Sequence, residues 1–195
     1  MEFYWCGGEV FLLTSGINIA QAIRENSLYA LACRQNKERE KICFFISHKD
    51  EDTDAAIALG KHITEDFGFN IYLDVYDKEL QEADKNNDSE GVVSAIHKGI
   101  QYASHLLCVV TEKSKDSWWI PYEIGFAQAN GVKTSSIKIK QAEYLPTYLR
   151  VDNSPVFCTI GELDDYLSKN WPYGGLFSKK VTGASNEETY LYFEK

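Results

Sequence analysis

Residues 114–127, SKDSWWIPYEIGFA, place two adjacent tryptophans and a proline immediately before a glutamate. Proline is comfortable in the first turn of a helix, where its missing N–H would have no intrahelical partner. Ser117 or Asp116 can cap such a helix from just upstream. The segment therefore predicts a helix that begins near Pro121 and ends near Gly131.

Glu123 is expected to lie beside the core of the protein. It follows Trp119 by four residues and so shares a helical face with it, next to an apolar stripe of Ile120, Ile124 and Ala127. Two interpretations are open. Glu123 can complement the positive end of the helix dipole while the tryptophans fill space under a loop, or it can serve a functional site at the start of the helix.

Apolar runs alternate with amphipathic segments on both sides of this helix. Strands are predicted at 42–47, 69–74, 105–111 and 133–140, and helices at 54–67, 92–103 and from a capping box at 159–162 onward. This alternation indicates βαβ units around a buried parallel sheet, with the polar 133–140 run as an edge strand. We expect a flavodoxin-like doubly wound α/β fold, which binds ligands at the carboxyl ends of its strands.

The chain of 195 residues suits one domain with an extension. Residues 17–34 predict a helix, so residues 1–40 are interpreted as an N-terminal helical extension, 41–170 as the domain and 171–195 as a tail.

The formal charge of −9 makes nucleic acid a poor candidate partner. Five cysteines without a CxxC pair indicate reduced thiols, and we expect a soluble cytoplasmic protein without a membrane segment.

Metal binding has no support in the sequence. The segment DKNNDSEG at 84–91 lacks the glycine and the final glutamate of a calcium-binding EF-hand loop, and a solvated, mobile loop is expected there. The histidines lack metal-ligand spacing, and His62 and His97 are expected on helix faces. His48 differs because it follows the carboxyl end of a predicted buried strand. No GxGxxG or P-loop glycine pattern is present, which disfavours hydride transfer in a Rossmann site.

Several motifs occur in a specific order: FFISHKDED, then GFNIYLD, then a variable polar segment, then GIQYASHLLCVVT followed by residues 114–127. This order closely resembles the Toll/interleukin receptor and resistance-protein (TIR) domain family, particularly its bacterial members. The family pattern S-x-x-S-x-W-x-x-x-E corresponds here to Ser114, Ser117, Trp119 and Glu123. The resemblance covers about residues 41–170 and leaves the first 40 residues and the tail outside.

The resemblance implies an enzyme that cleaves the bond between nicotinamide and ribose in NAD⁺, with NAD⁺ as substrate and no separate cofactor. It implies that Glu123 is the catalytic residue, where a carboxylate can stabilise positive charge developing on the ribose. Trp119 and Ser117 are expected near the substrate. The pocket walls implied by analogy are formed by Phe45, Ser47, His48 and Asp74.

The product is left open between ADP-ribose, a cyclic isomer and a conjugate. A compact chain with one such domain resembles the sensor component of bacterial anti-phage Thoeris systems, which would imply a separate effector protein that reads the nucleotide. The resemblance implies that the acidic 75–90 segment corresponds to a loop through which TIR domains pack. Because acidic loops of two copies repel each other, we expect TIR–TIR self-association to need a trigger. Two alternatives stay open: a non-enzymatic TIR adaptor and a nucleoside deoxyribosyltransferase-like enzyme.

Overall fold

The computed structural model describes residues 3–6, 9–12, 16–25, 42–139, 142–143, 145–149, 154–172 and 193. The predicted connector after the N-terminal helix, Cys33 and nearly all of the predicted tail lie outside these residues. Of the cysteines whose side chains are described, Cys108 and Cys158 are free thiols.

A five-stranded, all-parallel sheet forms the centre of the domain. Its strands are β3 (Cys43–Ser47), β4 (Asn70–Tyr72), β5 (His105–Val110), β6 (Lys133–Lys138) and β7 (Val156–Phe157), in the spatial order β4-β3-β5-β6-β7. This is the strand order of flavodoxin-like folds, and it confirms the predicted fold class. From β3 the chain adds β4 on one side and then β5, β6 and β7 on the other, so the strand order reverses at β3. Ligand sites of such folds lie at this reversal point.

The prediction that residues 133–140 form an edge strand was wrong. Strand β6 is enclosed between β5 and β7, with Ser136 and Ile137 paired to Val156 and Phe157. The sequence did not indicate β7 because two residues give no readable periodicity. Two polar side chains of β6 form local hydrogen bonds: the Ser135 hydroxyl donates to the Leu106 carbonyl at 3.3 Å, and the Thr134 hydroxyl pairs with the Ser154 hydroxyl at 2.8 Å. The Ser136 hydroxyl is buried without a hydrogen-bond partner among the described residues.

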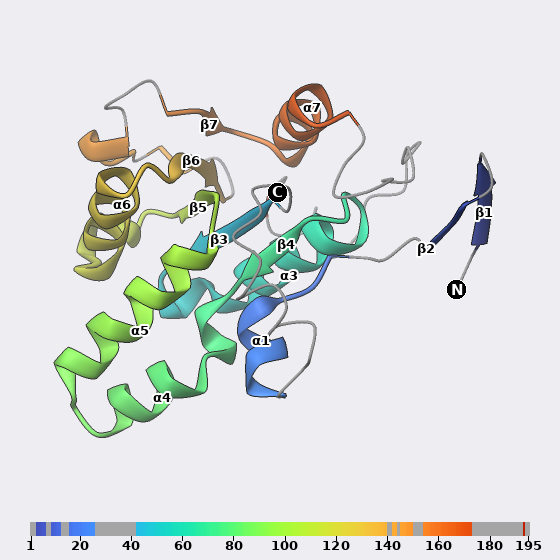
Figure 1. The fold of residues 1–195 in the computed structure, drawn as a ribbon. Coiled ribbons are helices and arrows are strands. Elements are labelled where there is room, and N and C mark those ends of the chain that lie inside the picture. Colours follow the sequence, from blue (N-terminus) through green and yellow to red (C-terminus); the bar gives the residue numbers. More distant parts are fainter. Residues whose placement is uncertain are drawn as a thin grey trace.

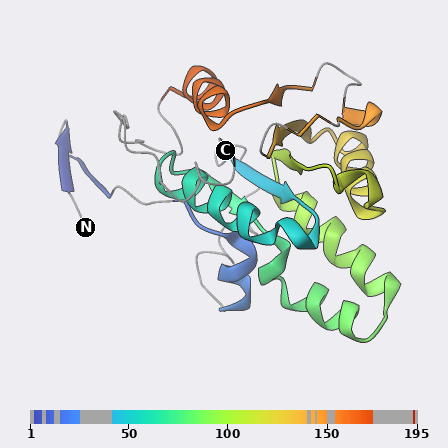
Figure 2. The same cartoon turned by 180° about the vertical axis from the view of Figure 1, so that it is seen from behind.

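Helices cover both faces of the sheet (Figures 1 and 2). One face carries α3 (Thr53–Glu65) and α7 (Ile160–Asn170), and the other carries α1 (Ile19–Arg24), α5 (Ser89–Tyr102) and α6 (Trp119–Ala129). Alternate strand residues supply the two cores: Phe44 and Ile46 face α3, whereas Phe45 faces α5. This alternation follows from the two-residue period of a strand and explains why the central strands β3 and β5 are largely apolar on both faces.

The polar segment 75–90 is largely helical, and the solvated loop expected at 84–91 is reduced to an exposed turn between two helices. It contains the helix α4 (Lys78–Lys85), whose N-cap Asp77 accepts hydrogen bonds from the amides of Glu79 and Leu80. Asp88 then caps α5, which begins at Ser89, three residues before the predicted start. The turn between the two helices uses Asn87 at φ 53°, a conformation that asparagine tolerates. Capping by acidic side chains therefore orders a segment that composition alone marked as loop.

The described N-terminal residues contain a hairpin and one short helix. Phe3–Cys6 (β1) and Glu9–Leu12 (β2) form an antiparallel hairpin that the sequence did not indicate, and Figures 1 and 2 show it apart from the main sheet. Within residues 17–34, where a helix was predicted, the structure describes α1, which ends at Arg24 with Glu25 as its C-cap. Residues 26–34 lie outside the described residues.

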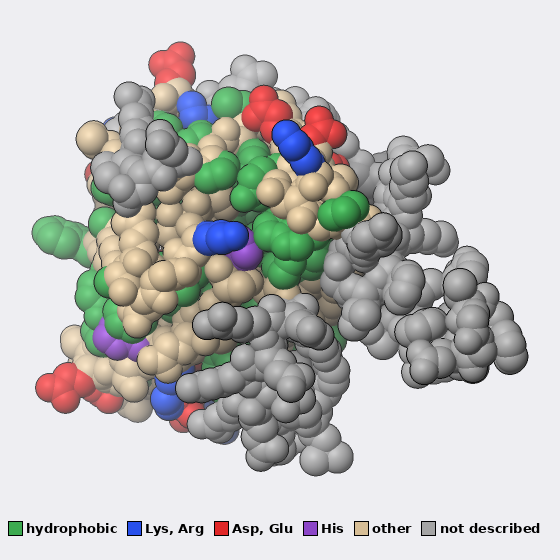
Figure 3. Space-filling view, turned by 45° about the horizontal axis from the view of Figure 1, so that its top comes forward, with side chains coloured by type: hydrophobic (Ala, Val, Ile, Leu, Met, Phe, Trp, Pro, Cys, Tyr) green, Lys and Arg blue, Asp and Glu red, His purple; other side chains and the backbone are tan. Residues whose placement is uncertain are grey.

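No helix within the described residues combines the length and apolarity needed to span a membrane. On the face drawn in Figure 3, the described Lys and Arg side chains stand apart from one another.

Candidate functional site

The buried carboxylate of Glu123 meets the end of strand β3. The Ser47 hydroxyl, at the last position of β3, donates a hydrogen bond of 2.5 Å to Glu123 Oε2. Glu123 is only 4% exposed, although it lies in the second turn of α6. Two residues from separate predicted elements thus form one enclosed polar contact at the carboxyl end of the sheet.

The start of α6 sets this position. The Ser117 hydroxyl accepts a hydrogen bond from the Ile120 amide at 3.2 Å, so Ser117 acts in the capping role expected for it or for Asp116. Pro121 follows in the first turn, as predicted. The apolar stripe of Ile120 and Ile124 is buried against β5 and α5, which turns Glu123 inward with it.

Burial governs the acidity of Glu123. Removal from water, followed by the nearby Asp74 charge, raises the pKa of this carboxyl, the Ser47 hydrogen bond lowers it, and the net pKa is about 8. A large share of Glu123 is therefore protonated at neutral pH in the unliganded protein. A group poised in this way is typical of functional sites.

Asp74 and His48 lie beside each other at the same edge of the sheet. Asp74 follows β4, and its Oδ1 lies 3.7 Å from His48 Nδ1, just after β3. Burial, followed by the charge of Asp50, raises the pKa of Asp74, while His48 lowers it. The Asp74 side chain is 22% exposed overall, yet its Oδ1 is buried and has no hydrogen-bond partner among the described residues. A buried acceptor without a partner is suited to a ligand hydroxyl.

Three further residues of this region, Thr111, Asp52 and Cys108, were not singled out from the sequence. Thr111 follows β5, and its hydroxyl donates to Asp52 at 2.9 Å while its amide donates to the Ser114 hydroxyl at 2.9 Å. Cys108 pairs with Ser47 across the β3–β5 ladder, and burial together with the Glu123 charge raises the pKa of its thiol. The position of Thr111 directly after a buried strand was a signal that could have found it.

The remaining predicted site residues are not gathered around Glu123 in the same way. Phe45 is buried in the core, where its ring stacks on Tyr72. Trp119 is 43% exposed and makes an edge contact with Tyr122, while Trp118 is 90% exposed. The tryptophans therefore do not fill space under a loop, as one interpretation of the sequence supposed.

The two histidines expected on helix faces have different surroundings. His62 lies on a face of α3, as expected, and is buried, with its two ring nitrogens 2.7 Å from Asp66 and from Asp164 of α7. His97 stacks on Phe126 and shares a hydrogen bond of 2.6 Å with the Tyr122 hydroxyl. Within the described part of the chain, no cluster of three or more His, Cys, Asp or Glu residues could hold a metal ion.

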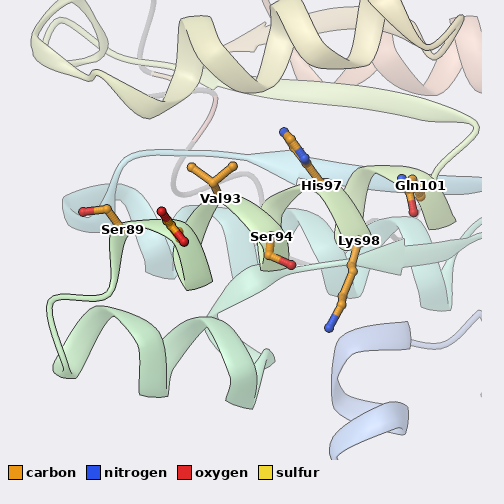
Figure 4. A pocket seen from close by; sticks show the side chains of 7 residues that line it. Ser89, Val93, Ser94, His97, Lys98 and Gln101 are labelled. Atoms are coloured by element: carbon orange, nitrogen blue, oxygen red, sulfur yellow. The ribbon is translucent and has the colours of Figure 1, made fainter.

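A separate open groove of about 550 Å³ follows one stripe of α5 (Figure 4). Its lining residues are Ser89, Glu90, Val93, Ser94, His97, Lys98 and Gln101. Figure 4 shows His97 turned toward α6 and Lys98 turned to the opposite side, where it pairs with Glu79 of α4. Glu123 does not line this groove, so the groove and the buried carboxylate are different features.

The fold and the polar edge define a doubly wound α/β domain with an enclosed glutamate at the carboxyl ends of its parallel strands. A sequence model of the TIR domain family matches residues 44–161, which is more than half of the chain. The chain belongs to the TIR domain family.

The chain is also similar to a Bacillus cereus (strain MSX-D12) protein named as a probable 3′ cyclic ADP-D-ribose synthase ThsB′. The two are 25% identical over 116 residues, which are 58% of this chain and 58% of that protein. The match thus spans less than two thirds of the relative's length.

Proposed function

We propose that this protein cleaves the nicotinamide–ribose bond of NAD⁺ in the cytoplasm as part of a bacterial anti-phage response of Thoeris type. The observation that carries the proposal is the enclosed Glu123 carboxyl, held by Ser47 at the ligand-binding edge of a TIR domain. The similarity to a protein named as a cyclic ADP-ribose synthase supports the same chemistry.

The proposed reaction breaks the C1′–N bond, and its electron pair leaves with nicotinamide, which becomes neutral. Positive charge then develops on the ribose, where ionised Glu123 stabilises it in a site with little competing water. The buried Oδ1 of Asp74 accepts a hydrogen bond from a ribose hydroxyl. Water at C1′ gives ADP-ribose and a proton, whereas an internal nucleophile gives a cyclic isomer that a separate effector protein reads.

The raised pKa of Glu123 fits a site whose substrate is a cation. The positive nicotinamide ring favours the ionised form of the carboxyl when NAD⁺ binds. Because Glu123 is 4% exposed, the side chains that cover it must move before the ribose can reach it. Trp119, one turn earlier and partly exposed, is placed to present its ring to the nucleotide as that opening forms.

The test compares the purified wild type with Glu123→Gln and with Glu65→Gln, an exposed control on α3. Nicotinamide release from NAD⁺ and the masses of the products are measured, with chromatography to separate cyclic isomers. Release by the wild type and by Glu65→Gln, but not by Glu123→Gln, is expected. Equal release by all three proteins would remove Glu123 from the mechanism.

A non-enzymatic interaction module is the second candidate, and exposed aromatic residues favour it. Trp118, Trp119 and Tyr122 present large apolar side chains at the start of α6. Such a surface suits TIR–TIR association. If the wild type never releases nicotinamide, even at high concentration or with infected-cell extract, and Trp118→Ser weakens self-association in sedimentation, this function replaces the first.

A further inference from the structure

Residues 16–25 run along the outer edge of the sheet, beside β4 (Figure 1). The Ile71 amide donates to the Ile17 carbonyl at 2.9 Å, and the Gly16 amide donates to the Thr64 carbonyl at 2.9 Å. The Ile17 amide donates to the Asn70 side chain at 3.1 Å. This N-terminal strap, residues 16–25, therefore pairs with the edge strand as a short additional strand would.

The strap fits this edge closely. A Cβ atom at Gly16 would lie 1.7 Å from the Phe69 carbonyl oxygen, so the approach is possible only for glycine. Ile19 and Ala20 are buried in the same core as Phe45 and Tyr72. These contacts make the strap a part of the folded domain.

Asn18 connects the strap to the end of β4. Its Oδ1 accepts a hydrogen bond of 3.1 Å from the Ala20 amide, which caps α1, and one of 3.4 Å from the Leu73 amide. Leu73 is the residue immediately before Asp74. The Tyr76 amide then donates to the Leu73 carbonyl at 3.2 Å, which closes the turn that carries Asp74.

We propose that Asn18 is a positioning residue, which holds the end of β4 so that the Asp74 carboxylate stays beside Glu123. The proposal names a support for the site in the proposed function, but its test does not need turnover. Three groups face Glu123: Asp74, which follows β4, Ser47 of β3 and Cys108 of β5. The groups that face Asp74 are Glu123, His48, Asp50 and Tyr72.

Three substitutions separate the two hydrogen bonds of Asn18. Asn18→Ser can still cap α1 but is too short to reach the Leu73 amide, whereas Asn18→Ala loses both contacts and Asn18→Asp keeps both acceptors. Gln21→Ala is the matched control, since its side chain is exposed on α1 and contacts only Glu25 at 3.0 Å among the described residues.

The readout is the titration of the Glu123 carboxyl by ¹³C NMR in the full chain, assigned by its loss in Glu123→Gln. If Asn18 positions Asp74, the Ala and Ser variants shift the Glu123 pKa downward, because the charge that raises it moves away. Asn18→Asp and Gln21→Ala keep the wild-type value. A lowered melting temperature with an unchanged Glu123 pKa in the Ala and Ser variants would show a purely structural role and overturn the proposal.

This result is independent of the activity assay. Absence of nicotinamide release overturns the proposed function and leaves the titration valid. Where release is observed, the rising limb of kcat/KM against pH moves in the same direction as the titration, since that limb reports ionisation in the free enzyme.

Discussion

Ser47 and Glu123, 76 residues apart in the sequence, are joined by a hydrogen bond of 2.5 Å. The bond links the last residue of β3 to the second turn of α6, the helix that follows the neighbouring strand β5. It stabilises the ionised form of a carboxyl that burial otherwise keeps protonated, so Ser47 controls how much active carboxylate exists at a given pH.

Ser47→Ala should raise the pKa of Glu123 further, because the hydrogen bond that lowers it is removed. Nicotinamide release at neutral pH should then fall about tenfold or more, since a hydrogen bond to a charged group is worth about 1.5–3 kcal/mol. The measurement is kcat/KM across pH. Thr53→Ala serves as control, and a rising limb at the wild-type position in Ser47→Ala would contradict this role.

Asp74→Asn should move the same limb in the opposite direction. Removing this charge lowers the pKa of Glu123, so more carboxylate is present at neutral pH. The midpoint of the pH profile should shift to lower pH even if kcat itself decreases through loss of the ribose contact. A midpoint that rises, or stays fixed, would mean that the two carboxyls are not electrostatically linked.

Glu123→Gln should make the fold more stable at alkaline pH. An acid whose folded pKa is raised contributes full stability below its unfolded pKa, near 4.3, and that stability is lost as pH rises through the folded value of about 8. The variant should therefore gain on the order of 4–5 kcal/mol relative to wild type at about pH 8 and little at about pH 4. Urea unfolding at both pH values checks this, and a gain independent of pH would contradict it.

His62 should hold α7 against α3 in a pH-dependent way. Burial alone would lower the pKa of His62, but the hydrogen bonds and charges of Asp164 and Asp66 outweigh it and raise the pKa. The resulting stability is present below the unfolded pKa of about 6.5 and is lost as pH rises through the folded value.

His62→Gln should cost about 3–5 kcal/mol at slightly acidic pH, because it leaves two partly buried carboxylates without their cation. The loss should shrink as pH increases, which denaturant unfolding at several pH values can follow. His97→Gln, at a more exposed imidazole, is the matched control. A cost that does not change with pH would show that His62 is neutral in the folded protein.

The strand–helix alternation, the start of α6 and the inward placement of Glu123 could be predicted from the sequence. Each depends on local chemistry: the burial period of strands and helices, the fixed φ of Pro121, and the capping hydroxyl of Ser117. The family resemblance, carried by the order of short motifs, gave the strand order and the candidate carboxylate. Residues 84–91 were expected to form a loop from their composition, but the side chains of Asp77 and Asp88 cap two helices that extend into this segment.

Tertiary structure alone decided the contacts that give those residues their properties. The Ser47 bond and the nearby Asp74 charge set the acidity of Glu123, and the strap at Asn18 supports the end of β4. His62 became an ion-pair centre because Asp164, 102 residues away, packs against it. Electrostatic energies depend on distance and on exclusion of water, and both arise only when segments remote in sequence enclose the same space.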